Sequence, residues 1–112
     1  ASGTDMNHAA EIFSVNMKSG ISTALTAVNK DIYQSIQLSE VKKKWIKTSD
    51  DKEMLSWIIY PPGFDSTKKY PTLLYCQGGP QSALSQFYSY RWNFQLMAAN
   101  VCMQVTAHRC WW

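Results

Sequence analysis

The strongest constraint on the fold is an unbroken apolar run at residues 72–76 that leads into a Gln-Gly-Gly-Pro loop at residues 77–80. A run without polar alternation is typical of a strand buried on both faces, as in a parallel or mixed sheet. The two glycines behind it can take positive φ and let a ligand approach their N–H groups closely. The pattern predicts a strand that ends in a sharp loop. An ordinary tight turn is the alternative to a ligand-binding loop.

The segment after this loop predicts a helix and a further strand. Apolar residues recur at the spacing of one helical face, at Tyr88, Trp92, Leu96 and Ala99. Asn100 is a suitable helix end, and residues 101–106 fit one more strand. Strand, glycine-rich loop, helix and strand begin an α/β unit, which is incomplete because a parallel sheet needs several crossovers. The predicted fold class is therefore α/β with an unfinished sheet, whose unpaired edges predict marginal stability and aggregation.

The first third of the chain predicts β structure. Residues 10–17 alternate between apolar and polar, residues 18–20 form a turn signal, and residues 21–28 follow as a second strand rich in β-branched residues. A two-stranded ribbon is marginal alone, so this hairpin must pack on other strands. The polar stretch at residues 29–40 suits a helical turn or a packed linker. We expect a boundary near Ser39.

Beyond this boundary, two more strands are predicted at residues 41–47 and 54–60, and prolines at 61 and 62 stop the second. The first contains the tightest basic cluster, Lys42-Lys43-Lys44. A net charge of +3 and a charged fraction of 17% do not indicate a nucleic-acid surface. We interpret the lysines as a solvated strand edge or linker. Apolar residues at 46% exclude a disordered chain.

The loop at residues 77–80 stands where α/β hydrolases place oxyanion-hole donors, at the end of an apolar strand. A nucleophile is missing, since no serine stands in a G-x-S-x-G elbow. His8, with Glu11 three residues on, lacks further ligands at metal spacing, and a surface or turn histidine is expected. His108 has no carboxylate to orient it as a base.

The remaining candidates for binding chemistry give no site. The aromatic residues between 87 and 94 are interpreted as core rather than as a stacking platform. The three cysteines cannot all pair with one another, and no C-x-x-C spacing suggests a metal or redox site. No run of apolar residues is long enough to span a bilayer. We expect no cofactor, no bound metal, no nucleic-acid partner and no membrane span.

Two adjacent stretches carry a resemblance to a known family. Residues 57–65 read WIIYPPGFD, and residues 69–82 read KYPTLLYCQGGPQS. Together they resemble the entry to the peptidase domain in the prolyl oligopeptidase and dipeptidyl peptidase IV family. The hairpin that begins with residues 7–15 is similar to the last blade of that family's β-propeller, and residues 87–100 are similar to its first helix. The resemblance covers about residues 5–100.

The resemblance implies a serine peptidase in which a β-propeller precedes an α/β-hydrolase domain. Residues 1–39 would end the propeller, and residues 40–112 would begin the peptidase domain. The Ser, Asp and His of the family's triad would lie downstream, so we expect this chain alone to be inactive. The family often has Tyr or His where this chain has Gln77, so the backbone N–H of Gly78 is the safer oxyanion donor and the Gln77 amide a less certain one. The implied partner is a peptide substrate, and a periplasmic or secreted location follows only by analogy.

Some features depart from the family pattern. Asp50-Asp51 stands where relatives usually have Asp-Gly, and residues 101–112 lose the resemblance, for which we hypothesise a change of reading frame or an assembly error. The start at Ala1 rather than Met favours a piece of a longer protein. A non-catalytic β-rich interaction module and a fragment without function of its own are the alternatives to a peptidase.

Overall fold

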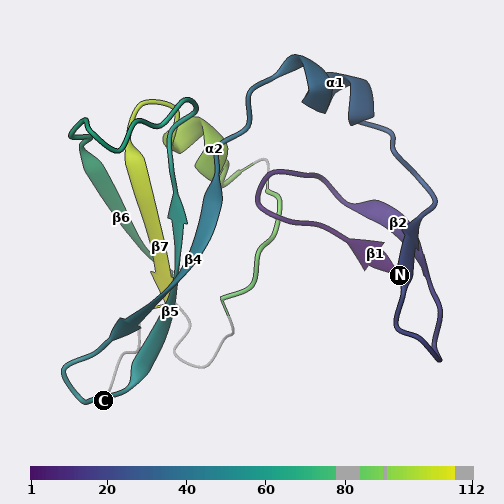
Figure 1. Cartoon of the computed structure of the whole chain (residues 1–112), viewed down its shortest axis with the longest axis horizontal. Coiled ribbons are helices and arrows are strands. Elements are labelled where there is room, and N and C mark those ends of the chain that lie inside the picture. The colour runs from purple at the N-terminus through teal and green to yellow at the C-terminus, as the bar shows by residue number, and fades with distance from the viewer. Residues whose placement is uncertain (78–83, 90, 108–112) are drawn as a thin grey trace. The chain divides into compact units, whose positions relative to one another are not determined.

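The computed structural model of the chain describes residues 1–77, 84–89 and 91–107, and it contains two compact units (Figure 1). The first unit comprises residues 1–38 with residues 86–93. The second runs from residue 39 to residue 85 and resumes at residue 94. Across the described residues, no helix has the length and apolar character that a membrane span requires.

The first unit is a three-stranded antiparallel sheet followed by a short helix. Its strands are β1 (Ser2–Gly3), β2 (Glu11–Val15) and β3 (Ser22–Ala24), and its helix is α1 (Lys30–Ser35). The predicted hairpin is confirmed as β2 and β3, which pair from Phe13 opposite Ala24 to Val15 opposite Ser22. Both strands are shorter than the sequence pattern suggested, although backbone hydrogen bonds continue one residue beyond the register on each side, from Leu25 N–H to the Ile12 carbonyl at 2.8 Å and from Asn16 N–H to the Ile21 carbonyl at 2.9 Å.

The hairpin turn and the extra strand β1 each depend on a glycine. Gly20 has a φ of 71°, a left-handed value that costs glycine little. Its N–H donates to the Asn16 carbonyl at 2.8 Å. Gly3 of β1 lies against the Phe13 ring, so that a Cβ there would stand 2.8 Å from Phe13 Cε2. β1 is too short for the alternation pattern to reveal it.

The second unit is a mixed four-stranded sheet in the order β4-β5-β7-β6. Its strands are β4 (Val41–Lys47), β5 (Glu53–Ile59), β6 (Thr72–Gln77) and β7 (Cys102–Ala107), with the short helix α2 (Phe94–Met97) before β7. The pairs β4–β5 and β5–β7 are antiparallel, and β6–β7 is parallel. The strands predicted at 41–47, 54–60 and 101–106 are therefore confirmed to within a residue at each end.

The core of this unit lies on one face of the sheet. Val105 on β7 is opposite both Trp57 on β5 and Tyr75 on β6, so the three side chains share a face. Val105 and Ile59 are fully buried, and Phe94 of α2 is 3% exposed with its ring 5.4 Å from that of Tyr75. The apolar burial of the second unit is therefore concentrated between this sheet face and α2.

Two expectations about this unit are wrong. The run at residues 72–76 does form a strand, but β6 stands at the edge of the sheet, and Leu74 is 63% exposed rather than buried. The helix predicted from Tyr88 to Asn100 is reduced to Phe94–Met97. Aromatic and Asn residues have weak helix propensity, and Trp92 is 42% exposed, so the first half of the pattern does not mark a buried face.

β7 is formed by residues from the stretch that does not resemble the family, residues 101–112. Its Met103, Val105 and Thr106 are all buried. β7 lies between β5 and β6 and hydrogen-bonds to both (Figure 1). The hypothesis of a reading-frame change after Asn100 stays a hypothesis, but residues 102–107 are fully integrated into the sheet.

Candidate active site

The candidate site lies at the carboxyl end of β6, where Gln77 is the last residue of the strand. Alternation along the strand puts Gln77 on the same face as Tyr75, which is the face that carries the core. Gln77 is partly buried, and its Oε1 is buried without a hydrogen-bond partner within the described residues. Such an acceptor requires a donor, because a buried polar atom left unpaired costs about 1–3 kcal/mol.

Gly78, the other predicted site residue, lies outside the described residues, as do Gly79 and Pro80. The described chain resumes at Leu84, whose side chain is only 7% exposed. Its carbonyl oxygen accepts a hydrogen bond from Trp57 Nε1–H at 3.0 Å. The chain that resumes at Leu84 is therefore fixed to β5, on the core face of the sheet.

The connection that leads into β6 is held by an aromatic cluster. Phe64 lies between two tyrosine rings, with its centroid 4.4 Å from that of Tyr60 and 5.2 Å from that of Tyr70. The Tyr70 hydroxyl accepts the Asp65 N–H at 3.1 Å. Asp65 in turn accepts the N–H and the hydroxyl of Thr67, and these two hydrogen bonds lower the pKa of its carboxyl group. These contacts explain why the loop from β5 to β6 has a defined path.

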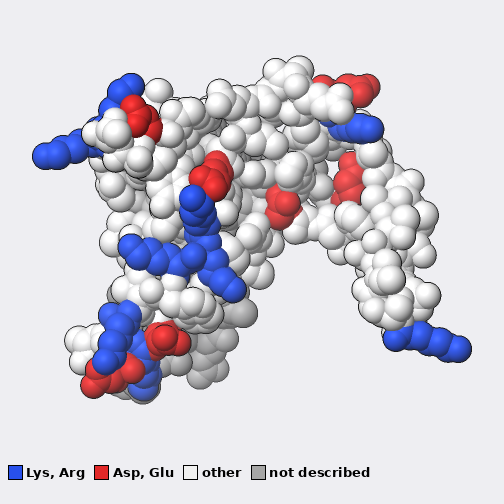
Figure 2. Space-filling model, viewed as in Figure 1, with Lys and Arg blue, Asp and Glu red and all other residues white. Residues whose placement is uncertain are grey.

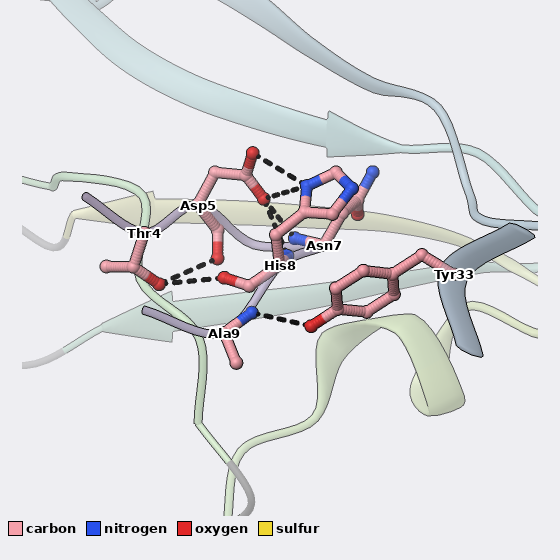
Figure 3. A network of polar contacts seen from close by, with 6 residues as sticks. All are labelled: Thr4, Asp5, Asn7, His8, Ala9 and Tyr33. Atoms are coloured by element: carbon pink, nitrogen blue, oxygen red, sulfur yellow. Dashed lines mark hydrogen bonds and ion pairs between the residues drawn. The ribbon is translucent and has the colours of Figure 1, made fainter. Parts of the chain in front are cut away.

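A second polar cluster, in the first unit, involves His8 (Figure 3). Its Nδ1 lies 2.9 Å from Asp5 Oδ2, and Asp5 also accepts the backbone N–H groups of Asn7 and His8, both at 2.7 Å. The His8 ring meets the Tyr33 ring edge-on at 4.8 Å, and the Tyr33 hydroxyl accepts the Ala9 N–H at 2.8 Å. This network ties residues 5–9 to α1.

The side chain that pairs with His8 is Asp5, three residues before it, and not Glu11, three residues after it. Glu11 instead accepts the Thr26 hydroxyl and the Val28 N–H. The sequence signal that was missed is Asp5, whose carboxylate accepts the N–H of Asn7 two residues on, as in an Asx-turn, and also contacts His8. The interpretation of His8 as a turn histidine is confirmed. Throughout the described ranges, no three His, Cys, Asp or Glu side chains gather closely enough to hold a metal ion.

The network borders an open cavity of about 660 Å³ within the first unit. The cavity is lined mainly by small and apolar groups such as Phe13, Ala24 and Leu38, with Glu11 and Lys30 among its charged residues. Glu11 is already engaged by Thr26 and Val28, so it supplies no free carboxylate for a ligand. The described residues around this cavity show no nucleophile paired with His8.

The other candidate residues from the sequence lie in different surroundings. Lys42, Lys43 and Lys44 lie on the edge strand β4 with exposed side chains, which confirms the strand-edge interpretation (Figure 2). Cys76 and Cys102 are free thiols. His108 and Cys110 fall outside the described residues. The aromatic stretch is mixed, since Phe94 is core whereas Trp92 is exposed, with the Arg91 guanidinium 5.7 Å from its ring.

Comparison with known proteins gives consistent relatives, although no family model matches the chain. The chain is 46% identical over 99 residues to dipeptidyl-peptidase 5 of Porphyromonas gingivalis and 41% identical over 99 residues to that of Porphyromonas endodontalis. Each match covers 88% of this chain but only 14% of the relative, so the chain spans about one seventh of these proteins.

A solved structure agrees in fold. The acylaminoacyl peptidase of Pyrococcus horikoshii matches 97% of this chain and 18% of its own with a TM-score of 0.75 at 21% sequence identity. At that identity the likeness concerns the fold, whereas the two dipeptidyl peptidases supply the sequence relationship. The chain therefore belongs to the prolyl oligopeptidase and dipeptidyl peptidase IV family.

Proposed function

We propose that this chain is the part of a serine-type dipeptidyl peptidase that supplies the oxyanion side of the active site. The observation that carries the proposal is the position of the Gln-Gly-Gly-Pro loop. It follows β6, the third strand of its sheet in chain order, and precedes α2. α/β Hydrolases take one oxyanion-hole N–H from the loop between the third strand and the first helix. The 46% identity to a dipeptidyl-peptidase 5 supports peptide-bond hydrolysis as the chemistry.

In such an enzyme a serine attacks the scissile carbonyl, and negative charge develops on the carbonyl oxygen of the tetrahedral intermediate. Donors already aimed at that position stabilise the transition state without reorganising, and one such donor contributes about 3 kcal/mol. We assign this role to the backbone N–H of Gly78, which needs no particular side chain.

The Gln77 side chain is the second candidate donor. Its Oε1 is the buried end of the carboxamide and has no partner in the described structure. Once that oxygen takes a donor, the Nε2 group is the end that can donate to an oxyanion. Gln77 would thereby serve where many relatives use Tyr or His, and its contribution would be smaller than that of the backbone N–H.

We further propose that residues 1–39 end a β-propeller and that residues 40–112 begin an α/β-hydrolase domain. The two compact units meet in the chain between Leu38 and Ser39, which supports this division, although residues 86–93 group with the first unit. An all-antiparallel first sheet suits a propeller blade. A parallel β6–β7 pair joined through α2 suits an α/β domain. The substrate class for the whole protein is a peptide, and a periplasmic or secreted location stays an inference from relatives.

The test is a chimera. The matching segment of the P. gingivalis dipeptidyl-peptidase 5 is replaced by this chain, and release of a chromogenic leaving group from a dipeptidyl substrate is measured. We expect kcat/KM within about tenfold of the parent enzyme, because the loop would still present its donors. A folded chimera without activity would contradict the proposal. The 112-residue chain alone should release nothing, since it contains no G-x-S-x-G serine.

A further inference from the structure

Trp57 joins an interior strand of the second unit's sheet to the chain that follows the candidate loop. It lies on β5, which is hydrogen-bonded to β4 on one side and to β7 on the other (Figure 1). Its Nε1–H donates to the Leu84 carbonyl oxygen at 3.0 Å, and Leu84 is itself buried. The first described residue after the candidate loop is therefore held by a strand that is paired on both sides.

The connection that contains Gly78 is short, and the residues on both sides of it are held by the sheet. Only residues 78–83 stand between Gln77 and Leu84. Gln77 is held by its pairing with Ala107 in the β6–β7 ladder, and Leu84 is held by the indole of Trp57. Ordering a connection costs less conformational entropy when it is short and its ends are already fixed. The hydrogen bond from Trp57 supplies one of these two fixed ends.

A tryptophan on β5 is well suited to act as an anchor. The indole N–H is a donor only, and the ring has few torsions, so the direction of the N–H is set once the ring is packed. Trp57 lies opposite Val105 of β7, which is fully buried on the core face of the sheet. Groups that stand on strands are placed more precisely than groups on loops. Trp57 therefore offers its N–H to Leu84 from a rigid position.

We propose that Trp57 is a positioning residue for the oxyanion donor of the peptidase. The inference rests on the proposed function, in which the backbone N–H of Gly78 stabilises the tetrahedral intermediate. Such a donor is effective only when it is already aimed at the developing charge, and a displacement of about 1 Å can cost about 100-fold in rate. Trp57 acts through the loop, by limiting where the chain that returns from it can lie.

The test compares Trp57→Phe with Tyr70→Phe in the dipeptidyl-peptidase chimera. Each variant keeps an aromatic ring and loses one hydrogen bond between a side chain and the backbone, to the Leu84 carbonyl at 3.0 Å or from the Asp65 N–H at 3.1 Å. Only the first bond lies after the candidate loop. We expect Trp57→Phe to lower kcat about tenfold and to keep KM within about twofold, because the donor acts in the transition state. Tyr70→Phe should keep both constants within about twofold of the chimera.

A double-mutant cycle with Gly78→Pro separates positioning from general stability, with circular dichroism establishing that each variant is folded at the assay temperature. If Trp57 acts through the loop donor, Trp57→Phe should lower kcat no further once Gly78→Pro has removed that donor. An additional loss of about tenfold in the Gly78→Pro background would overturn the positioning role. So would an unchanged kcat in Trp57→Phe, or equal losses in Trp57→Phe and Tyr70→Phe. Full activity of Gly78→Pro alone would instead contradict the proposed function.

Discussion

Replacing Trp57 by Phe tests whether the indole on β5 holds the chain that returns from the candidate loop. The substitution removes the Nε1–H that donates to the Leu84 carbonyl at 3.0 Å. A hydrogen bond of this kind contributes about 1 kcal/mol net, and the loss of part of a half-buried ring adds about 1 kcal/mol. We therefore expect the free energy of unfolding to fall by about 2 kcal/mol.

The assay is urea denaturation followed by circular dichroism. Trp45→Phe is the matched control, because Trp45 lies on the edge strand β4 with 54% of its surface exposed. That variant should change stability by less than about 0.5 kcal/mol. Equal effects of the two substitutions, or no effect of Trp57→Phe, would refute the anchoring role of the indole.

Two further predictions concern hydrogen bonds away from the candidate loop. Tyr33→Phe keeps the ring against His8 but removes the hydroxyl that accepts the Ala9 N–H. This variant should lower the free energy of unfolding by about 1 kcal/mol in the same urea assay. An unchanged urea midpoint would show that the hydroxyl is dispensable. Hydrogen bonds from Thr48 and Lys52 lower the pKa of Asp50 to about 2, so this carboxylate stabilises the fold above its unfolded pKa of 3.8 and loses that effect as the pH falls towards 2. Asp50→Asn should therefore make the melting temperature depend less on pH between pH 4 and pH 2. The same pH dependence in the variant and the unaltered chain would contradict the stabilising role of the Asp50 carboxylate.

Strands with clear apolar–polar alternation, or with turn-forming residues at their ends, were predictable from the sequence. The hairpin around Gly20 and the strands β4 and β5 follow from local pattern; β4 and β5 agree with the prediction to within a residue, whereas both hairpin strands are shorter than predicted. Asp51 has a φ of 60° in the β4–β5 turn, at the position for which the family resemblance implies glycine. The turn therefore keeps the backbone conformation that the family pattern implies, at the cost of a left-handed Asp.

The position of each strand in the sheet was not predictable, because it depends on pairing between distant segments. Nothing local to residues 72–77 says that β7 takes the interior position beside β5 while β6 is left at the edge. The length of the helix before β7 was overestimated for a related reason. Its aromatic spacing matched a helical face, but among its described residues only Phe94 and Ala98 are buried.

The end of β6 at the candidate site was predictable from the sequence, whereas the contacts that support it were not, and the loop itself lies outside the described residues. Gln77 stands at the end of β6 as the apolar run and the Gly-Gly pair indicated. The Trp57–Leu84 hydrogen bond joins residues 27 positions apart and leaves no local signature. The Asp5–His8 pair does have one, a three-residue spacing, and attention to the acidic residue before the histidine as well as after it would have found it.

The most direct measurement compares two substitutions of Gly78 in the dipeptidyl-peptidase chimera. Gly78→Pro removes the backbone N–H, whereas Gly78→Ala keeps it, so only the first deletes the proposed oxyanion donor. We predict that Gly78→Pro lowers kcat by about 100-fold to 1,000-fold, while Gly78→Ala stays within about tenfold of the chimera. Equal losses in two equally folded variants, or full activity of Gly78→Pro, would contradict the assignment of this loop to the oxyanion site.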